Sequence, residues 1–308
     1  MSAGVELRNA SRWYGNVVAV NAVSCTLGPG ITGLLGPNGA GKSTVLHLIA
    51  GLLRPSGGDV LVNGSHTTGN PAVYRSLGIV PEREAVHPFL TGYEFVRMNA
   101  RLQHLPNPDE ATRDAISLVD MEDAQHRRIG TYSKGMRQRI KIAGAIVHEP
   151  EILLLDEPFN GMDPRQRLHM MELLRARAAD GCVVLISTHI LEELNDLATN
   201  VLVMVSGRLA ASGHYREIRK LMTNRPHTFT LRSSDDRALA AALMREQSVS
   251  SVDLADSAAD GGLSVRTLDR GALTRALPRR AREGGIRIYE IRPTDESLES
   301  VFSYLVDR

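Results

Sequence analysis

A glycine-rich segment at residues 36–44 restricts the fold of this chain more than any other feature. It reads GPNGAGKST and matches the pattern G-x-x-x-x-G-K-[ST] at every fixed position. An apolar run, Gly30–Leu35, precedes it, and residues 44–53 follow with helical periodicity. Strand, loop and helix in this order form a phosphate-binding loop, in which backbone amides and a helix N-terminus hold phosphate groups. The sequence therefore predicts an α/β fold built around a nucleotide site.

Every residue of this loop is a candidate phosphate contact. We expect Lys42 to reach the β- and γ-phosphates and Ser43 to hold Mg²⁺. The alternative, a chance glycine-rich turn, is disfavoured by the flanking strand and helix. Kinases, GTPases and many ATPases share such a loop, so a second site has to distinguish them. The full expected set is Gly36, Pro37, Asn38, Gly39, Ala40, Gly41, Lys42, Ser43 and Thr44.

Two carboxylates follow a second buried strand. The apolar run Glu151–Leu155 leads directly into Asp156 and Glu157. Ligands of open α/β sheets bind at the carboxyl ends of the strands. We expect Asp156 to hold Mg²⁺ and Glu157 to polarise the water that attacks the γ-phosphate. The alternative, the start of a solvated loop, loses weight because the phosphate loop is complete.

A histidine follows the next apolar strand. That strand, Cys182–Ser187, is separated from the acidic one by a helical stretch, Gln166–Ala178, which is the pattern of a βαβ unit with parallel strands. His189 then emerges at the same sheet edge as the two carboxylates. A neutral imidazole there would donate to the γ-phosphate and position the attacking water. A lone histidine after a strand is more often without a role, but this topology favours function.

The stretch 132–139, YSKGMRQR, lies shortly before the acidic strand. It resembles the signature of the ATP-binding cassette (ABC) family, usually written LSGGQ, and the resemblance covers about residues 5–215. Ser133 is suited to cap the helix that follows, and the start of that helix is an anion site. The resemblance implies that Ser133 and Gly135 of one copy close on the γ-phosphate held by a second nucleotide-binding subunit. Two ATP molecules would thus be sandwiched in a head-to-tail dimer.

Three further positions match the family in order. Tyr14 stands where the family places an aromatic ring that stacks on adenine. Asp163 resembles the acidic residue of the loop that crosses the dimer interface, and His189 matches the switch histidine. Glu82 stands where the family usually carries glutamine, and the resemblance implies that it approaches Mg²⁺ directly or through water.

The departures from the family pattern indicate a branch. Tyr132, Lys134 and Met136 replace the usual leucine, glycine and glutamine of the signature. Together with Glu82 and the ending at 293–302, they resemble the bacterial ABC-2-type exporters. The resemblance implies an ATP-hydrolysing subunit that drives export through separate membrane-spanning permease subunits. It would lie peripherally on the cytoplasmic face of the cell membrane.

Composition limits the other functions. The chain has 308 residues, 43% apolar and 23% charged, which is typical of soluble globular proteins. Its 36 basic and 35 acidic residues give a net charge of +1, so no nucleic-acid partner is expected. No apolar run approaches the roughly 20 residues that cross a bilayer. A soluble ABC-type ATPase acting without a membrane partner is the alternative function. A non-catalytic nucleotide sensor would require losses among Lys42, Asp156, Glu157 and His189, and all four are present.

The expected organisation has two domains. Residues 1–220 would form the cassette, with a RecA-like core, an antiparallel β-subdomain and a helical subdomain at about 84–148. Residues 221–308 would form a small α+β domain. Its predicted elements run β-α-β-β-α-β, a ferredoxin-like pattern, with a final helix from Asp295.

Two helix starts within the helical subdomain carry capping signals. Thr91 and Glu94 have the spacing of a capping box. Asn107 precedes Pro108, which suits the first position of a helix.

Overall fold

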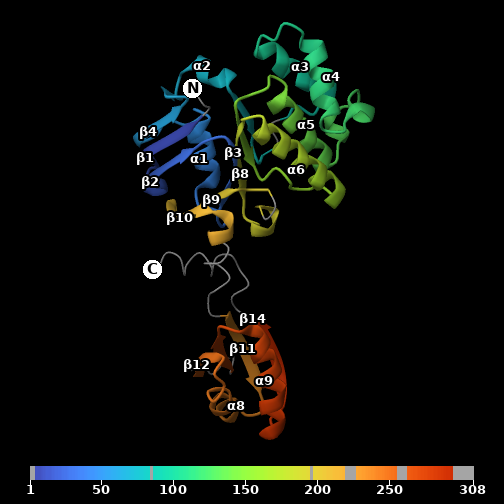
Figure 1. Cartoon of the computed structure of the whole chain (residues 1–308). Helices are drawn as coiled ribbons and strands as arrows, with labels where there is room; N and C mark the ends of the chain where they lie inside the picture. Colours follow the sequence, from blue (N-terminus) through green and yellow to red (C-terminus); the bar gives the residue numbers. More distant parts are fainter. Residues whose placement is uncertain (1–3, 84–85, 195–196, 219–226, 255–261, 294–308) are drawn as a thin grey trace. The chain divides into compact units, whose positions relative to one another are not determined.

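The computed structural model describes residues 4–83, 86–194, 197–218, 227–254 and 262–293. The chain divides into two compact units, residues 1–215 and 216–308, and each is described by itself (Figure 1). Among the described residues, no helix is both long and apolar enough to span a membrane.

A mixed sheet of six strands forms the centre of the first unit, in the order β10-β9-β3-β8-β7-β6. All neighbouring strands are parallel except β10, which runs antiparallel to β9. The strands β7 and β8 are buried along their whole length because both faces of the sheet are covered, which explains their continuous apolar sequences. The strand bounds are β3 (Gly30–Leu35), β6 (Leu77–Val80), β7 (Ile152–Asp156), β8 (Val183–Thr188), β9 (Asn200–Val205) and β10 (Arg208–His214).

A second, antiparallel sheet has the order β2-β1-β4-β5. Helix α1 (Lys42–Ile49) packs against both sheets, and one apolar core joins Leu7 and Val60 of this sheet to Val45 of α1 and Leu154 of the central sheet. The expected antiparallel β-subdomain is therefore present. Its strands are β1 (Val5–Tyr14), β2 (Val17–Leu27), β4 (Gly57–Val62) and β5 (Ser65–His66), and a short helix, α2 (Pro71–Arg75), follows.

Three helices, α3 (Gly92–Leu102), α4 (Pro108–Ser117) and α5 (Lys134–Ile146), pack together, and Figure 1 draws them in green on one flank of the first unit. Short 3₁₀ turns at Glu122–Ala124 and Ile129–Thr131 connect α4 to α5. Helix α6 (Pro164–Ala179) packs against β3 and β8.

The two predicted helix starts behave differently. Thr91 Oγ1 accepts from the Glu94 backbone N–H at 3.1 Å, and Glu94 Oε2 accepts from the Thr91 N–H at 2.8 Å, so the capping box is confirmed. Asn107 makes no side-chain cap bond to the described residues of α4. Its amide donates instead to Glu110 Oε2 at 3.2 Å.

The second unit contains the β-α-β-β-α-β order that the sequence predicts. Its antiparallel sheet has the order β12-β13-β11-β14. Apolar side chains of α8 and α9, such as Leu239 and Leu277, pack on Leu231 and Val265 of the sheet. The elements are β11 (His227–Ser233), α8 (Asp236–Leu243), β12 (Val249–Leu254), β13 (Leu263–Thr267), α9 (Arg270–Glu283) and β14 (Ile288–Pro293). The final helix predicted from Asp295 lies outside the described residues.

Candidate active site

The glycine-rich loop connects β3 to α1, as the sequence predicts. At two positions of the loop the structure explains why the residue is glycine. Gly41 has φ +99°, in the left-handed region, and a Cβ on it would lie 2.4 Å from the carbonyl oxygen of Ala19. A Cβ on Gly36 would lie 2.5 Å from the carbonyl oxygen of Met204. The loop therefore tolerates no side chain at these positions.

Lys42 is the first residue of α1, and its side chain is directed back into the loop. Its ammonium donates to the carbonyl oxygens of Gly36 at 2.7 Å and Pro37 at 3.1 Å. Burial lowers the pKa of Lys42, while the nearby carboxylates of Glu157, Asp156 and Glu82 act in the opposite direction. The lysine is thus held at the sheet edge among three acidic residues.

A cavity of about 320 Å³ lies in front of the loop. It brings the phosphate loop together with Asp156 at the end of β7, with Glu157 directly after it, and with Glu82 from the segment after β6. Three of the expected loop residues are not part of the described lining. Ala40 is buried, and the carbonyl oxygens of Gly36 and Pro37 accept hydrogen bonds from Lys42. The lining consists of Ala19, Asn38, Gly39, Gly41, Lys42, Ser43, Thr44, Glu82, Asp156 and Glu157.

The two carboxylates at the end of β7 are both buried but have different surroundings. The hydroxyl of Ser187 on β8 donates to Asp156 Oδ1, and the two residues are paired across the parallel strands. Glu157 has φ +48° and its backbone N–H donates to the Ser187 carbonyl at 3.1 Å. Ser187 was not singled out from the sequence, because only the strand register reveals that it faces Asp156.

Glu157 and His189 form a pair. Glu157 Oε1 and His189 Nδ1 are 2.9 Å apart, with the glutamate side chain 7% exposed and the histidine 41% exposed. Burial raises the pKa of Glu157, and the hydrogen bond from His189 partly offsets this. A buried carboxylate with a raised pKa beside a solvent-facing imidazole is suited to accept a proton from a bound water.

The signature segment begins α5. Ser133 Oγ accepts from the Met136 N–H at 3.2 Å, so the predicted N-cap is present. Gly135 is tightly packed, since a Cβ on it would lie 2.6 Å from the carbonyl oxygen of Gly161. Among the described residues of one chain, the lining of the cavity in front of Lys42 does not include Ser133 or Gly135.

Two departures from the family signature have local explanations. Tyr132 is 2% exposed, and its hydroxyl donates to the Ala124 carbonyl at 2.7 Å, so a tyrosine is accommodated where the family has leucine. The aliphatic part of Lys134 lies against Gly161, on which a Cβ would meet Lys134 Cγ at 2.7 Å. The signature therefore packs against the loop that precedes α6.

Asp163 and Tyr14 are both exposed. Asp163 caps α6 by accepting from the Gln166 N–H at 2.8 Å. Tyr14 ends β1, and the guanidinium of Arg12 lies 4.8 Å from the centre of its ring. Neither Tyr14 nor Asp163 is among the described residues that line the cavity in front of Lys42.

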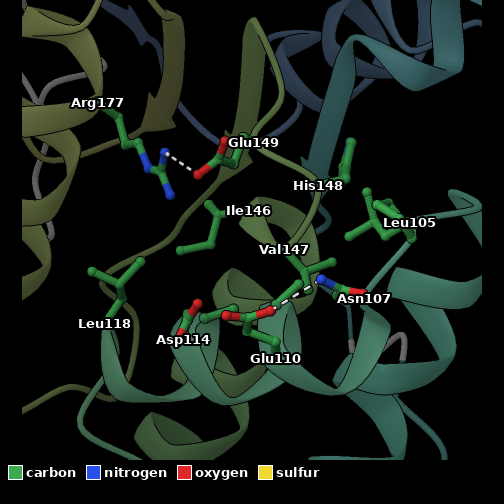
Figure 2. A pocket seen from close by; sticks show the side chains of 13 residues that line it. Leu105, Asn107, Glu110, Asp114, Leu118, Ile146, Val147, His148, Glu149 and Arg177 are labelled. Carbon is green, nitrogen blue, oxygen red and sulfur yellow. Dashed lines mark hydrogen bonds and ion pairs between the residues drawn. The ribbon is translucent and has the colours of Figure 1, made fainter.

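A second cavity, of about 270 Å³, shares no lining residue with the first. Figure 2 shows Glu110 and Asp114 of α4 on one side of it and Arg177 of α6 on the other, where Arg177 is paired with Glu149 at 3.9 Å. It contains no element of the phosphate loop and lies at the end of α5 opposite the signature.

The family model described as "ABC transporter" matches residues 20–160. The chain is 36% identical over 245 residues to the daunorubicin/doxorubicin resistance ATP-binding protein of Streptomyces peucetius, a match that covers 78% of this chain and 74% of the relative. The chain belongs to the family of ABC transporter ATP-binding proteins. The expected family is therefore confirmed, and with it the class of ABC ATPases.

Other comparisons agree with this membership. The chain is 31% identical over 305 residues to the bacitracin transport ATP-binding protein of Enterococcus faecalis, which covers 98% of this chain and 96% of that protein. An uncharacterized ABC transporter ATP-binding protein of a Nostoc species is 37% identical over 207 residues. That match spans 66% of this chain and 62% of the Nostoc protein, which is less than two thirds of its length.

A solved dimeric structure of a bacterial ABC transporter cassette has the same fold. Its TM-score is 0.65 at 23% identity, and the match covers 69% of this chain and 99% of that chain. The expected cassette fold is thus confirmed for the first unit.

Proposed function

We propose that this ABC ATPase hydrolyses MgATP in a head-to-tail dimer and thereby drives export through separate permease subunits. The observation that carries the proposal is the Glu157–His189 pair at 2.9 Å. Of this pair, Glu157 lines the cavity together with Lys42 and Asp156. A phosphate-binding loop with a general base close to it is suited to hydrolysis of the nucleotide and not only to its binding.

In this mechanism Glu157 orients the attacking water and accepts its proton. If the neutral imidazole of His189 donates its Nδ1–H to the Glu157 carboxylate, its Nε2 is left as an acceptor. A neutral His189 would then not donate to the γ-phosphate, contrary to the expectation from the sequence. For Nε2 to donate to the γ-phosphate, the pair must hold one more proton. The proton that Glu157 takes from the water would meet this need, so the pair would stabilise the departing phosphate only once attack has begun.

Three side chains support the proposed binding of Mg²⁺. Ser43, Asp156 and Glu82 line one cavity, and their hydroxyl and carboxylate oxygens are the ligand type that Mg²⁺ prefers. No cage of three or more His, Cys, Asp or Glu side chains exists among the described residues. Mg²⁺ is commonly held by one or two carboxylates and the substrate phosphates. When bound, the ion would neutralise charge on the phosphates.

A second copy is needed to complete the site. Ser133 is exposed at the start of α5 and does not join the described lining of the cavity on its own chain. The helix N-terminus it caps is suited to an anion, because its first amides are unpaired and its dipole is positive there. We propose that Ser133 and Gly135 bind the γ-phosphate on the partner copy, that Asp163 faces that copy, and that Tyr14 stacks on adenine.

We propose that the permease contact lies around Glu82 and the helical segment to about Tyr132. Phe89 is 67% exposed, and its ring stacks on His87 at 5.4 Å between centroids. An exposed aromatic of this size on a monomer is a common anchor for a partner. This segment lies a few residues after Glu82, so a permease bound there would adjoin the nucleotide cavity. The protein would then work at the cytoplasmic face of the membrane.

The cargo proposal rests on the relatives. Two of them are named for daunorubicin/doxorubicin resistance and for bacitracin transport. We propose that this chain likewise serves an ABC-2-type exporter of a hydrophobic drug or peptide antibiotic.

We also propose the domain limits 1–220 for the cassette, including a helical subdomain at about 84–148, and 221–308 for a ferredoxin-like domain. The sheet order β12-β13-β11-β14 supports the ferredoxin-like assignment. If the four strands are numbered 1 to 4 along the chain, their order across the sheet is 2-3-1-4.

Affinity purification of the full chain from its native membranes tests the proposal. We expect an integral membrane protein to copurify and the complex to hydrolyse ATP. Hydrolysis by a chain that copurifies with no membrane protein would instead support an ABC-type ATPase acting without a membrane partner.

A further inference from the structure

A third carboxylate lies behind the Glu157–His189 pair and has no part in the mechanism above. Glu193, 6% exposed, belongs to the short 3₁₀ turn Leu191–Leu194 that follows His189. Its Oε2 accepts from the Thr188 hydroxyl at 2.7 Å. The same hydroxyl oxygen accepts from the Ile190 N–H at 3.0 Å. Glu193 therefore holds both chain neighbours of His189 through one hydroxyl group.

The other oxygen of Glu193 is directed toward α6. Glu193 Oε1 lies 3.6 Å from Arg167 Nη1, and the buried Nε of Arg167 has no hydrogen-bond partner among the described residues. Arg167 is in the first turns of α6, just after its cap, Asp163. The carboxylate thus connects the segment around His189 to α6, the helix that follows the loop at 160–163.

The position of Glu193 is fixed by packing on the central sheet. Leu194 is fully buried and fills the space above Gly33 of β3, where a Cβ would lie 2.3 Å from Leu194 Cδ1. A buried carboxylate is costly unless its hydrogen bonds and charge are satisfied. Here Thr188 donates a hydrogen bond to the carboxylate of Glu193, and Arg167 supplies the opposite charge. The network is therefore part of the packed interior rather than an incidental surface contact.

We propose that Glu193 is a positioning residue for His189. Through its ion pair with Arg167, the position of His189 is coupled to the position of the loop at 160–163. The inference rests on the proposed hydrolysis at Glu157 and His189. Among the described residues, Glu193 makes no hydrogen bond to any of the three carboxylates that line the cavity, although its charge contributes to the raised pKa of Glu157. Its removal should therefore slow the chemical step and leave nucleotide binding unchanged.

The test uses Thr188 variants of the full chain, measured by steady-state ATP hydrolysis and nucleotide binding. Thr188→Val keeps the volume and removes the hydroxyl, whereas Thr188→Ser keeps the hydroxyl. We expect Thr188→Val to lower kcat about tenfold, because small misplacements of catalytic groups have effects of this order or larger. KM and nucleotide affinity should stay within about twofold, and Thr188→Ser should retain the parental kcat.

Glu193→Gln and Arg167→Gln test the connection to α6. Each should lower kcat with KM unchanged, and the double variant should be no slower than the slower single one, because both changes break the same contact. Glu172→Gln, which removes an exposed carboxylate of α6, is the matched control and should hydrolyse at the parental rate.

Three outcomes overturn the inference while the proposed function stands. They are parental kcat in Thr188→Val and Glu193→Gln, a loss of nucleotide affinity equal to the loss of kcat, and multiplicative losses in the double variant. Failure of the parental chain to hydrolyse ATP would instead overturn the proposed function itself.

Discussion

His189 Nδ1 lies 2.9 Å from Glu157 Oε1 although the two residues follow different strands. The contact exists because β7 and β8 are adjacent and parallel, with Asp156 paired to Ser187, so their carboxyl ends meet at one sheet edge. Glu157 is buried and lines the cavity in front of the phosphate loop, whereas His189 is half-exposed and is not among the described residues of that lining.

Lys42→Ala should abolish nucleotide binding. The ammonium is the cation that the phosphate loop offers to the β- and γ-phosphates, and it is held at the cavity by Gly36 and Pro37. Equilibrium binding of a labelled ATP analogue measures the effect. Arg101→Ala is the control, because it removes an exposed cation of α3 outside the described lining of that cavity, and this variant should bind the nucleotide as the parent does. Unchanged binding in Lys42→Ala would contradict the assignment of the loop.

Ser187→Ala should weaken the binding of Mg²⁺ rather than the binding of the nucleotide. The Ser187 hydroxyl donates to Asp156 Oδ1 and so fixes the carboxylate proposed to hold the ion. Losing such an orienting contact is expected to raise the Mg²⁺ concentration for half-maximal rate about tenfold or more. A Mg²⁺ titration of the rate measures this. Ser212→Ala, on the exposed edge strand β10, should leave the titration unchanged.

His148 should make the fold less stable in mild acid. Burial lowers its pKa below the ordinary value of 6.5, although the hydrogen bond to the Leu77 carbonyl acts the other way. The unfolded chain therefore binds a proton near pH 6.5 that the folded chain does not, so stability present above pH 6.5 is lost as the pH falls through the folded pKa. His148→Gln should lose less thermal stability than the parent between about pH 7 and pH 5. Equal losses in both would contradict the prediction.

Tyr14→Ala should lower ATP affinity several-fold and affect GTP and ATP similarly, since stacking on a ring is tolerant of base identity. The ring is exposed and supported by Arg12 at 4.8 Å. Trp13→Ala, which removes the neighbouring exposed aromatic, is the control and should bind ATP as the parent does. Loss of affinity only in Trp13→Ala would mean that adenine stacks on the other ring.

Much of the fold and of the candidate site followed from local sequence. The phosphate loop, the two buried strands and the β-α-β-β-α-β tail are each marked by a short pattern of glycines, apolar runs or caps. Thr91 was recognisable because a capping box involves residues only three apart.

The rest depends on contacts between distant residues. Ser187 faces Asp156 only because of strand register, and Glu193 meets Arg167 only because the 3₁₀ turn Leu191–Leu194 lies beside α6. In the sequence, Glu193 is one of several polar residues after His189 and carries no signal of burial. Asn107 had the composition of a cap, but its side chain bonds to Glu110. Which partner such a side chain contacts depends on tertiary packing, which a single sequence does not reveal.

The Glu157→Gln variant with MgATP tests the central claim most directly. Glutamine keeps the shape of the side chain and removes the base, so the account predicts intact ATP binding, hydrolysis slowed at least about a hundredfold, and a stable dimer by sedimentation. Hydrolysis at the parental rate, or a variant that stays monomeric with ATP bound, would contradict it.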